Sequence, residues 1–130
     1  MSTYPDLQLY INGEWRKTTN DIPVVNPATE EEIGRLPHAN RQDLDDAIEA
    51  ATAGFRVWRK TAPADRANVL YKAAKLMRER QQDIATAITA EHGKPLDQAR
   101  LEVIRGCEFF EWDAGEATRT YGRVIPSAPG

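Results

Sequence analysis

The sequence is poor in the side chains that cross-link a protein or bind metal ions: 130 residues contain one cysteine and two histidines. A single cysteine cannot form a disulfide within the chain, so the sequence does not indicate a disulfide-stabilised secreted domain. No cysteine or second histidine stands at zinc-ligand spacing from His38 or His92. The acidic run at 30–32 lacks the alternating oxygen ligands and the glycine of a calcium loop. We therefore predict no metal site.

Long apolar runs and an excess of basic residues are also missing. The longest apolar runs are a few residues, against the roughly 20 needed to cross a bilayer, and the first residues lack the cationic start and apolar stretch of a secretory signal. Seventeen lysines and arginines oppose twenty aspartates and glutamates, a net charge of −3, which provides no basic field for nucleic-acid phosphates. We therefore expect a soluble cytoplasmic protein with no nucleic-acid or membrane partner.

The sequence has no glycine-rich loop for phosphate, because neither G-x-G-x-x-G nor G-x-x-x-x-G-K-[ST] occurs. Cys107 is the only thiol and hence a candidate nucleophile. Its neighbour Glu108 disfavours the reactive thiolate, whereas catalytic thiols have cationic neighbours or lie at a helix N-terminus. We interpret Cys107 as structural and predict that the chain contains no catalytic and no cofactor-binding residue.

What is present is the composition of a single globular domain, with 41% hydrophobic and 28% charged residues. The dipeptide Asn12-Gly13 tolerates the positive φ angles of a two-residue turn and predicts a tight hairpin between 9–11 and 14–16. Short β-type runs at 22–25 and 33–36, separated by a proline-containing turn, predict a second hairpin-like pair. The first third is therefore expected to form a β-ribbon over 8–37.

Helical periodicity begins at Asn40, a good N-cap residue, and extends to Gly122. It predicts four helices: 40–58, one beginning at Pro63, 83–90 and 97–121. Their expected inward residues are Leu44, Ala47, Ile48, Ala51, Phe55 and Trp58, then Ala67, Leu70, Ala73, Ala74 and Met77, and finally Leu101, Ile104, Phe109, Trp112 and Ala117. A strand is expected to begin at Arg123, with no partner downstream, as if the chain were interrupted there. The expected fold is mainly α-helical with an N-terminal β-ribbon.

Several segments follow one another in an order and spacing that resemble the start of the aldehyde dehydrogenase superfamily: LYINGEW at 9–15, VNPATEE at 25–31, EHGKPL at 91–96 and YGRVIP at 121–126. Phe55, Trp58, Pro63 and Arg66 extend the resemblance, which covers essentially the whole chain from Leu9. The Pro-His-Ala step at 37–39 and the stretch Phe-Glu-Trp at 110–112 are most similar to the succinate-semialdehyde dehydrogenase branch.

The resemblance implies an α/β parent fold of which residues 1–130 are the N-terminal part. The β-ribbon (8–37) and the helices (40–122) would then be followed by the start of an oligomerisation arm (123–130). It also implies a cytoplasmic homo-oligomer that oxidises a small aldehyde, with succinate semialdehyde expected, to a carboxylate with NAD or NADP through a cysteine nucleophile. The family's catalytic asparagine, glutamate and cysteine and its nucleotide-binding strands lie beyond Gly130. We therefore expect this chain alone to bind no cofactor and to be inactive.

The resemblance further implies that positions corresponding to Leu101 and Arg105 face the substrate entrance, where Arg105 would attract an anionic aldehyde. The alternative is a solvent-facing Arg105 paired with Glu102 or Glu108. For the chain as a whole, two other interpretations remain open. One is an independent, non-catalytic helical module that binds a protein partner. The other is part of a dehydrogenase for a different aldehyde, such as betaine aldehyde or an aliphatic one.

Overall fold

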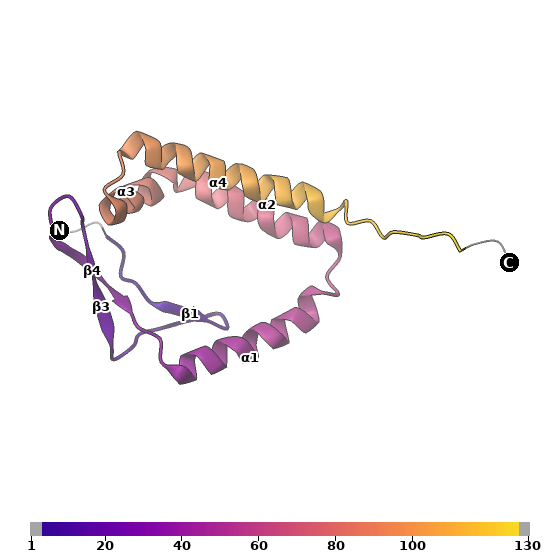
Figure 1. The fold of residues 1–130 in the computed structure, drawn as a ribbon, viewed down its shortest axis with the longest axis horizontal. Helices are drawn as coiled ribbons and strands as arrows, with labels where there is room; N and C mark the ends of the chain where they lie inside the picture. The colour runs from indigo at the N-terminus through magenta and orange to yellow at the C-terminus, as the bar shows by residue number, and fades with distance from the viewer. Residues whose placement is uncertain (1–3, 128–130) are drawn as a thin grey trace.

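The computed structural model describes residues 4–127, in which two β-hairpins precede four helices (Figure 1). Strand β1 (Leu9–Ile11) pairs antiparallel with β2 (Glu14–Arg16), and β3 (Asp21–Val25) pairs antiparallel with β4 (Glu32–Pro37). The helical fold with an N-terminal β-ribbon that the sequence predicted is confirmed. Residues 128–130 of the expected arm lie outside the described residues.

Both hairpins form for the local reasons that the sequence suggested. Asn12 and Gly13 have φ angles of 54° and 85°, the positive values that a tight type I′ hairpin requires. The turn places Tyr10 opposite Trp15, with ring centroids 4.7 Å apart. In the second hairpin, the Asn26 side chain accepts a hydrogen bond from the backbone N–H of Ala28 at 2.9 Å and so stabilises the turn between the strands.

The helix starts also follow the sequence. Helix α1 (Arg41–Trp58) begins with a capping box, in which the Asn40 side chain accepts from the Asp43 N–H at 3.0 Å and the Asp43 carboxylate accepts from the Asn40 N–H at 2.9 Å. Helix α2 (Pro63–Glu79) begins at its proline. Helix α3 (Gln81–His92) is longer than the predicted 83–90 and ends at Gly93, whose φ of 69° is the left-handed cap conformation.

Helix α4 (Leu96–Ala117) ends earlier than the predicted Tyr121. The hydroxyls of Thr118 and Thr120 donate to the carbonyls of Gly115 and Ala117. These hydrogen bonds satisfy carbonyls at the end of the helix that a further helical turn would otherwise bond through its backbone N–H groups.

The strand expected at Arg123 is wrong, because residues 119–127 form neither helix nor strand. Val124 and Ile125 are 90% and 81% exposed, and this segment leads away from the helices (Figure 1). A strand needs a partner for its backbone groups, and no neighbouring strand lies beside this segment in the described part of the chain.

The core lies where α4 packs along α2 and α3. Met77 of α2 lies over Gly106 and Tyr71 over Gly115, so α2 and α4 run antiparallel (Figure 1). The buried side chains of the core are small, which lets the helix axes approach closely. They are Ala74, Ala85, Ala99, Val103 and Cys107, with Met77, Ile84, Ile88 and Leu96 packed around them.

The sequence prediction chose the wrong face of α4. Leu101, Phe109 and Trp112 are 56%, 69% and 68% exposed, while Ile104 and Ala117 are half-buried. The buried residues Ala99, Val103 and Cys107 start two positions earlier, about 200° around the helix. Helix α2 contributes Ala74 to the core with these residues, and a face of small residues on α4 packs closely against it. The large side chains are therefore left on the opposite face.

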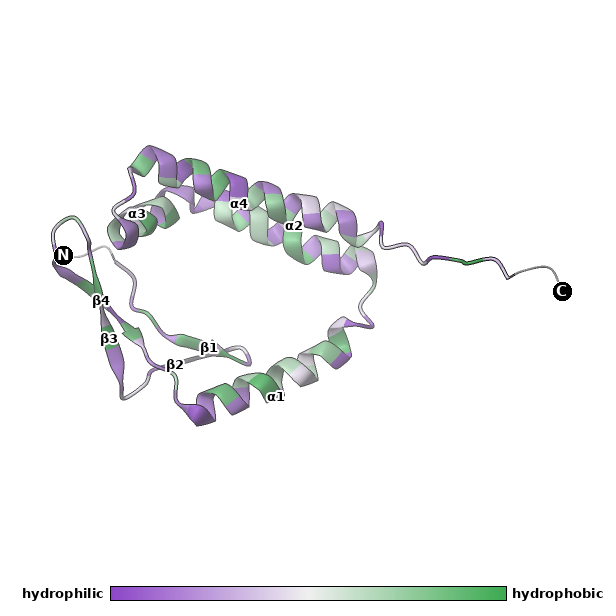
Figure 2. Cartoon of the chain, viewed as in Figure 1, coloured by the Kyte–Doolittle hydropathy of each residue, from purple (hydrophilic) through white to green (hydrophobic). Residues whose placement is uncertain are grey.

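The inward stripe predicted for α1 is also exposed. No residue of α1 is buried, and Leu44, Ile48 and Phe55 are 53%, 56% and 60% exposed. Figure 1 shows α1 beside β1 and apart from α2 and α4, and Figure 2 shows hydrophobic residues along its length. Arg16 of β2 ties it to the hairpin through an ion pair of 2.6 Å with Asp46. Among residues 4–127, no helix combines the length and apolar character needed to cross a bilayer.

Candidate functional site

The outward face of α4 borders a hollow of about 640 Å³, within the size range of small-molecule sites. Leu101 and Arg105, the two residues expected at a substrate entrance, both line it, because residues four apart lie on the same side of a helix. The complete lining is Lys94, Gln98, Leu101, Glu102, Arg105, Gly106 and Phe109. A neighbouring hollow on α4 is lined by Arg105, Glu108, Phe109 and Trp112.

The turn from α3 into α4 places a second cation at this hollow. Gly93 ends α3 in the left-handed conformation and Pro95 precedes the first turn of α4. Between them, Lys94 reaches along α4, and its Nζ donates to the carboxylate of Glu102. This hydrogen bond holds the pKa of Glu102 below its ordinary value, with a further contribution from the Lys94 charge.

The guanidinium of Arg105 makes no ion pair or hydrogen bond within residues 4–127. Glu102 is bonded to Lys94, and Glu108 does not reach Arg105. Arg105 is exposed, as the alternative expected, but it pairs with neither of these two carboxylates in this structure. The hollow holds two cations and one carboxylate, next to the exposed apolar side chains of Leu101 and Phe109. This combination can accommodate a small molecule with an apolar body and an anionic end.

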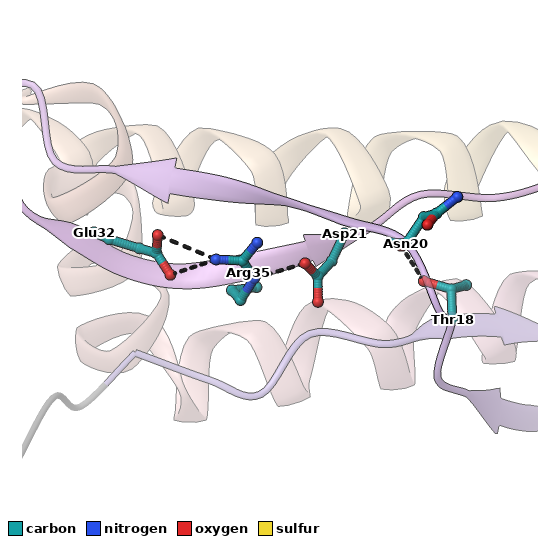
Figure 3. Close-up of polar contacts among 5 residues, drawn as sticks. All are labelled: Thr18, Asn20, Asp21, Glu32 and Arg35. Atoms are coloured by element: carbon teal, nitrogen blue, oxygen red, sulfur yellow. Dashed lines mark hydrogen bonds and ion pairs between the residues drawn. The ribbon is translucent and has the colours of Figure 1, made fainter.

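A second hollow, of about 390 Å³, lies between the N-terminal segment and the β3–β4 hairpin. Its cations are already paired. Arg35 donates to Asp21 at 2.6 Å and to Glu32 at 2.9 Å (Figure 3), and Lys17 lies 3.0 Å from Asp6. Because each positive charge here has a carboxylate partner, this hollow is less suited to binding an anion than the hollow on α4.

The remaining sequence candidates do not line the α4 hollow. Cys107 is 0% exposed and packs in the core beside Val103, which matches its interpretation as a structural thiol. His38 and His92 are exposed. Over residues 4–127, no three His, Cys, Asp or Glu side chains come together as metal ligands.

The described residues do not fit a nicotinamide dinucleotide. Such cofactors bind at the carboxyl edge of a parallel sheet, with the pyrophosphate at a helix N-terminus, and both sheets here are antiparallel pairs. Helix α1 follows a strand, but its N-terminus is occupied by the side chains of Asn40 and Asp43. The Asp43 carboxylate there would repel a phosphate.

Sequence reasoning did not single out Lys94, Phe109 or Trp112 as residues of this site. The signal for Lys94 was its place in the segment EHGKPL at 91–96, which contributed to the family resemblance but was not linked to this site. Phe109 and Trp112 were assigned to the core by helical period, since their spacing does not show which of two apolar faces is covered.

Comparison with known proteins shows which family the chain resembles in sequence. Residues 15–130 match the model of the aldehyde dehydrogenase family. The glutarate-semialdehyde dehydrogenase of Pseudomonas putida is 43% identical over 121 residues, and the malonate-semialdehyde dehydrogenase of Lacticaseibacillus casei is 39% identical over 123. An NADP-dependent succinate-semialdehyde dehydrogenase of Escherichia coli is 39% identical over 121 residues. Each match covers 92–93% of this chain and 25% of the relative, so the chain spans about a quarter of their length.

Solved structures resemble the chain over nearly all of its residues. An aldehyde dehydrogenase from Brucella melitensis biovar abortus superposes with a TM-score of 0.92 at 35% identity, covering 98% of this chain and 27% of that structure. A succinate-semialdehyde dehydrogenase from Burkholderia pseudomallei gives a TM-score of 0.91 at 34% identity with the same coverage. The hairpins and helices thus have the arrangement of one portion of these larger folds.

Proposed function

Because the chain belongs to the aldehyde dehydrogenase family, we propose that it forms the amino-terminal part of an enzyme that oxidises an aldehyde to a carboxylate with NAD or NADP. Its substrate is an aldehyde that carries an anionic group, and succinate semialdehyde is the member we expect. Residues Leu101 and Arg105 lie at the substrate entrance and bind the end of the molecule that does not react.

The observation that carries this proposal is the unpaired guanidinium of Arg105 beside apolar side chains. A guanidinium forms two parallel hydrogen bonds with a carboxylate. Leu101 and Phe109 are placed to contact the methylene groups between that carboxylate and the aldehyde. The attraction of Arg105 for an anion grows as the larger assembly excludes water from this face.

The names of the relatives agree with this substrate class. Malonate, succinate and glutarate semialdehydes each carry a carboxylate at the end opposite the aldehyde, and 3-sulfolactaldehyde, named for another relative, carries a sulfonate. These compounds differ in length but share an anionic end. A single cation on α4 would attract all of them, so it selects for charge more than for length.

The chain's own part in the reaction is to bind and orient. NAD or NADP supplies the hydride acceptor when it is bound, and since the described residues do not fit a dinucleotide, we assign cofactor binding and the reacting cysteine to residues outside this chain. Cys107 is buried in the core and takes no part. We also propose that the full-length enzyme is a cytoplasmic homo-oligomer, in which the extended segment from Arg123 begins the arm that contacts another subunit.

The first test is an assay of the purified chain with succinate semialdehyde and NAD or NADP. We expect no formation of reduced cofactor above that of the Cys107→Ala variant. Reduction that disappears in Cys107→Ala would show that the active site is in this chain and that our assignment is wrong.

The second test joins residues 1–130 to the remaining three quarters of the Pseudomonas putida relative. We expect this chimera to oxidise succinate semialdehyde with a lower KM than butanal, which has the same carbon chain without the carboxylate. Arg105→Met should raise the KM for succinate semialdehyde roughly tenfold, the loss expected for one charge-assisted hydrogen-bonded contact, and leave that for butanal unchanged. Equal effects on both aldehydes would contradict anion recognition by Arg105.

Two observations count against the other interpretations. A cationic substrate such as betaine aldehyde would be repelled by Arg105 and Lys94, which both line the hollow. A self-sufficient helical module would cover its large apolar side chains, but those of α1 and of the outward face of α4 are exposed. A soluble monomer that does not bind a hydrophobic dye would favour the module instead.

A further inference from the structure

Three charged side chains, Lys94, Glu102 and Arg105, line the same hollow on α4. Glu102 and Arg105 are three residues apart on one helix, the spacing at which opposite charges form side-chain pairs. They do not pair in this structure, because the carboxylate of Glu102 is bonded to Lys94. Arg105 is unpaired although a suitable acid lies within one turn of it.

The backbone conformation and partial burial of Lys94 stabilise the Lys94–Glu102 pair in addition to the attraction of the two charges. Lys94 follows the left-handed Gly93 and precedes Pro95, and the proline restricts the backbone of Lys94. Its side chain is only 32% exposed, while that of Glu102 is 54% exposed. A cation held in this position on restricted backbone loses less freedom on pairing than one on a mobile loop. Glu102 is therefore bonded toward the start of α4 and away from Arg105.

We propose that Lys94 is a positioning residue, which keeps the guanidinium of Arg105 available for the anionic end of the aldehyde by holding Glu102. The proposal rests on the function proposed above and adds a residue that need not touch the substrate. Without Lys94, Glu102 pairs with Arg105, and the hollow changes from two cations and one carboxylate to a neutral pair. The specificity for anionic aldehydes then falls although Arg105 is still present.

The test follows the Arg105 side-chain Nε–Hε signal by NMR in the chain as it exists, with residue 105 assigned from an Arg105→Lys variant. The probes are butyrate, which carries the carboxylate but cannot form imines with lysines, and butyramide, its uncharged counterpart. The variants are Lys94→Met, Lys94→Arg, the double variant Lys94→Met with Glu102→Gln, and a charge-matched control, Lys94→Met with Glu108→Gln. Circular dichroism confirms that each variant is folded.

Without any probe, we expect Lys94→Met to move the Arg105 signal and slow its exchange with water, as the pair with Glu102 forms. Adding Glu102→Gln should return the signal to its wild-type position, and Glu108→Gln should not. The Lys94→Met variant should bind butyrate about threefold more weakly than the wild type does. This loss in binding free energy is somewhat larger than the stabilisation by one ion pair on a helix. Lys94→Arg and the Glu102→Gln double variant should bind as the wild type does, and butyramide should move no Arg105 signal.

An unchanged Arg105 signal in Lys94→Met, or a failure of Glu102→Gln to restore it, would overturn the role of Lys94. A restoration by Glu108→Gln as complete as that by Glu102→Gln would also overturn it, because net charge alone would then explain the effect. If the probe-free changes occur as expected but butyrate does not move wild-type Arg105, the anionic substrate class fails and the hold of Lys94 on Glu102 stands.

Discussion

Arg78 of α2 and Glu111 of α4 form a two-point ion pair, in which Nε of Arg78 lies 3.1 Å from one carboxylate oxygen of Glu111 and Nη2 lies 2.8 Å from the other. The pair links the two helices that carry most of the core. Since α4 also carries the candidate site, this contact helps to set the rotation of α4 and hence the direction in which Arg105 faces.

Arg78→Met should lower the melting temperature slightly. The two side chains are 43% and 40% exposed, so water and salt screen the pair. The decrease is expected in low salt and should largely disappear in about 1 M sodium chloride, where the screening length is about 3 Å. Thermal melts at both salt concentrations measure it. Lys72→Met, which removes a cation that pairs with no acid in the described chain, serves as control and should show no such salt dependence.

Asn40→Ala should destabilise α1 by about 1 kcal/mol, because the capping box loses its side-chain acceptor. Since α1 buries no residue, the loss is expected as local opening rather than global unfolding. Amide hydrogen exchange within 41–58 should therefore accelerate roughly fivefold, and that of α2 and α4 should not change. Asn40→Ser keeps a capping oxygen and should exchange like the wild type. Equal exchange in the Ala and Ser variants would contradict a role for the cap.

Ionisation of Tyr4 should lower the stability of the folded chain at alkaline pH. Partial burial and its hydrogen bond to Glu91 raise the pKa of Tyr4 from 10.0 to about 12. The folded state therefore retains a proton that the unfolded state loses, so this contribution is complete below pH 10.0 and is lost as the pH rises toward about 12. Phenolate absorbance should show one of the four tyrosines titrating last. Tyr4→Phe should remove that step and no other.

Gly34→Ala should disturb Tyr4 by a clash with its ring. A Cβ at residue 34 would lie 2.5 Å from the Tyr4 ring, so the ring must move and its hydrogen bond to Glu91 is strained or lost. We expect the pKa of Tyr4 to fall toward its ordinary value, followed by the same absorbance titration. Gly54→Ala, where an added Cβ meets nothing within 4 Å, is the matched control and should leave the tyrosine titration unchanged.

Val103→Ala should lower the free energy of unfolding by about 2 kcal/mol, since it removes two buried methyl groups from the contact of α4 with its neighbours. Ile48→Ala removes more atoms but from the exposed face of α1, so its effect should stay below about 0.5 kcal/mol. Urea denaturation compares the two variants. A larger loss for Ile48→Ala would mean that α1 is covered in solution, for example by association of chains.

Local features of the fold could be predicted because their causes lie within a few residues. Asn12 and Gly13 determine the first turn, Asn40 and Asp43 cap α1, and Pro63 begins α2, each through bonds or φ angles of neighbouring residues. The spacing of Leu101 and Arg105 likewise placed them on one side of a helix. Their role at a substrate entrance came from the family resemblance and is proposed here.

Burial was predicted correctly on α2, where the expected inward residues Ala67, Leu70, Ala73, Ala74 and Met77 are buried or half-buried, but not on α1 and α4. On α4, periodicity is equally satisfied by the face of Leu101 and Phe109 and by the face of Ala99 and Val103, and the size of the residues favoured the wrong one. The same limit applies to Arg105. Whether its charge is neutralised depends on Lys94, eleven positions earlier by residue number, which becomes a neighbour only through the turn after α3.

The sequence by itself determined where turns and helices begin and which family the chain resembles, since those follow from local bonding and from ordered motifs. Only the tertiary structure decided that α4 packs by its small side chains, that Cys107 is enclosed, and that Glu102 bonds to Lys94 and leaves Arg105 unpaired. The physical reason is that packing and charge pairing are chosen by competition between surfaces and partners distant along the chain, and that competition is resolved when the helices meet.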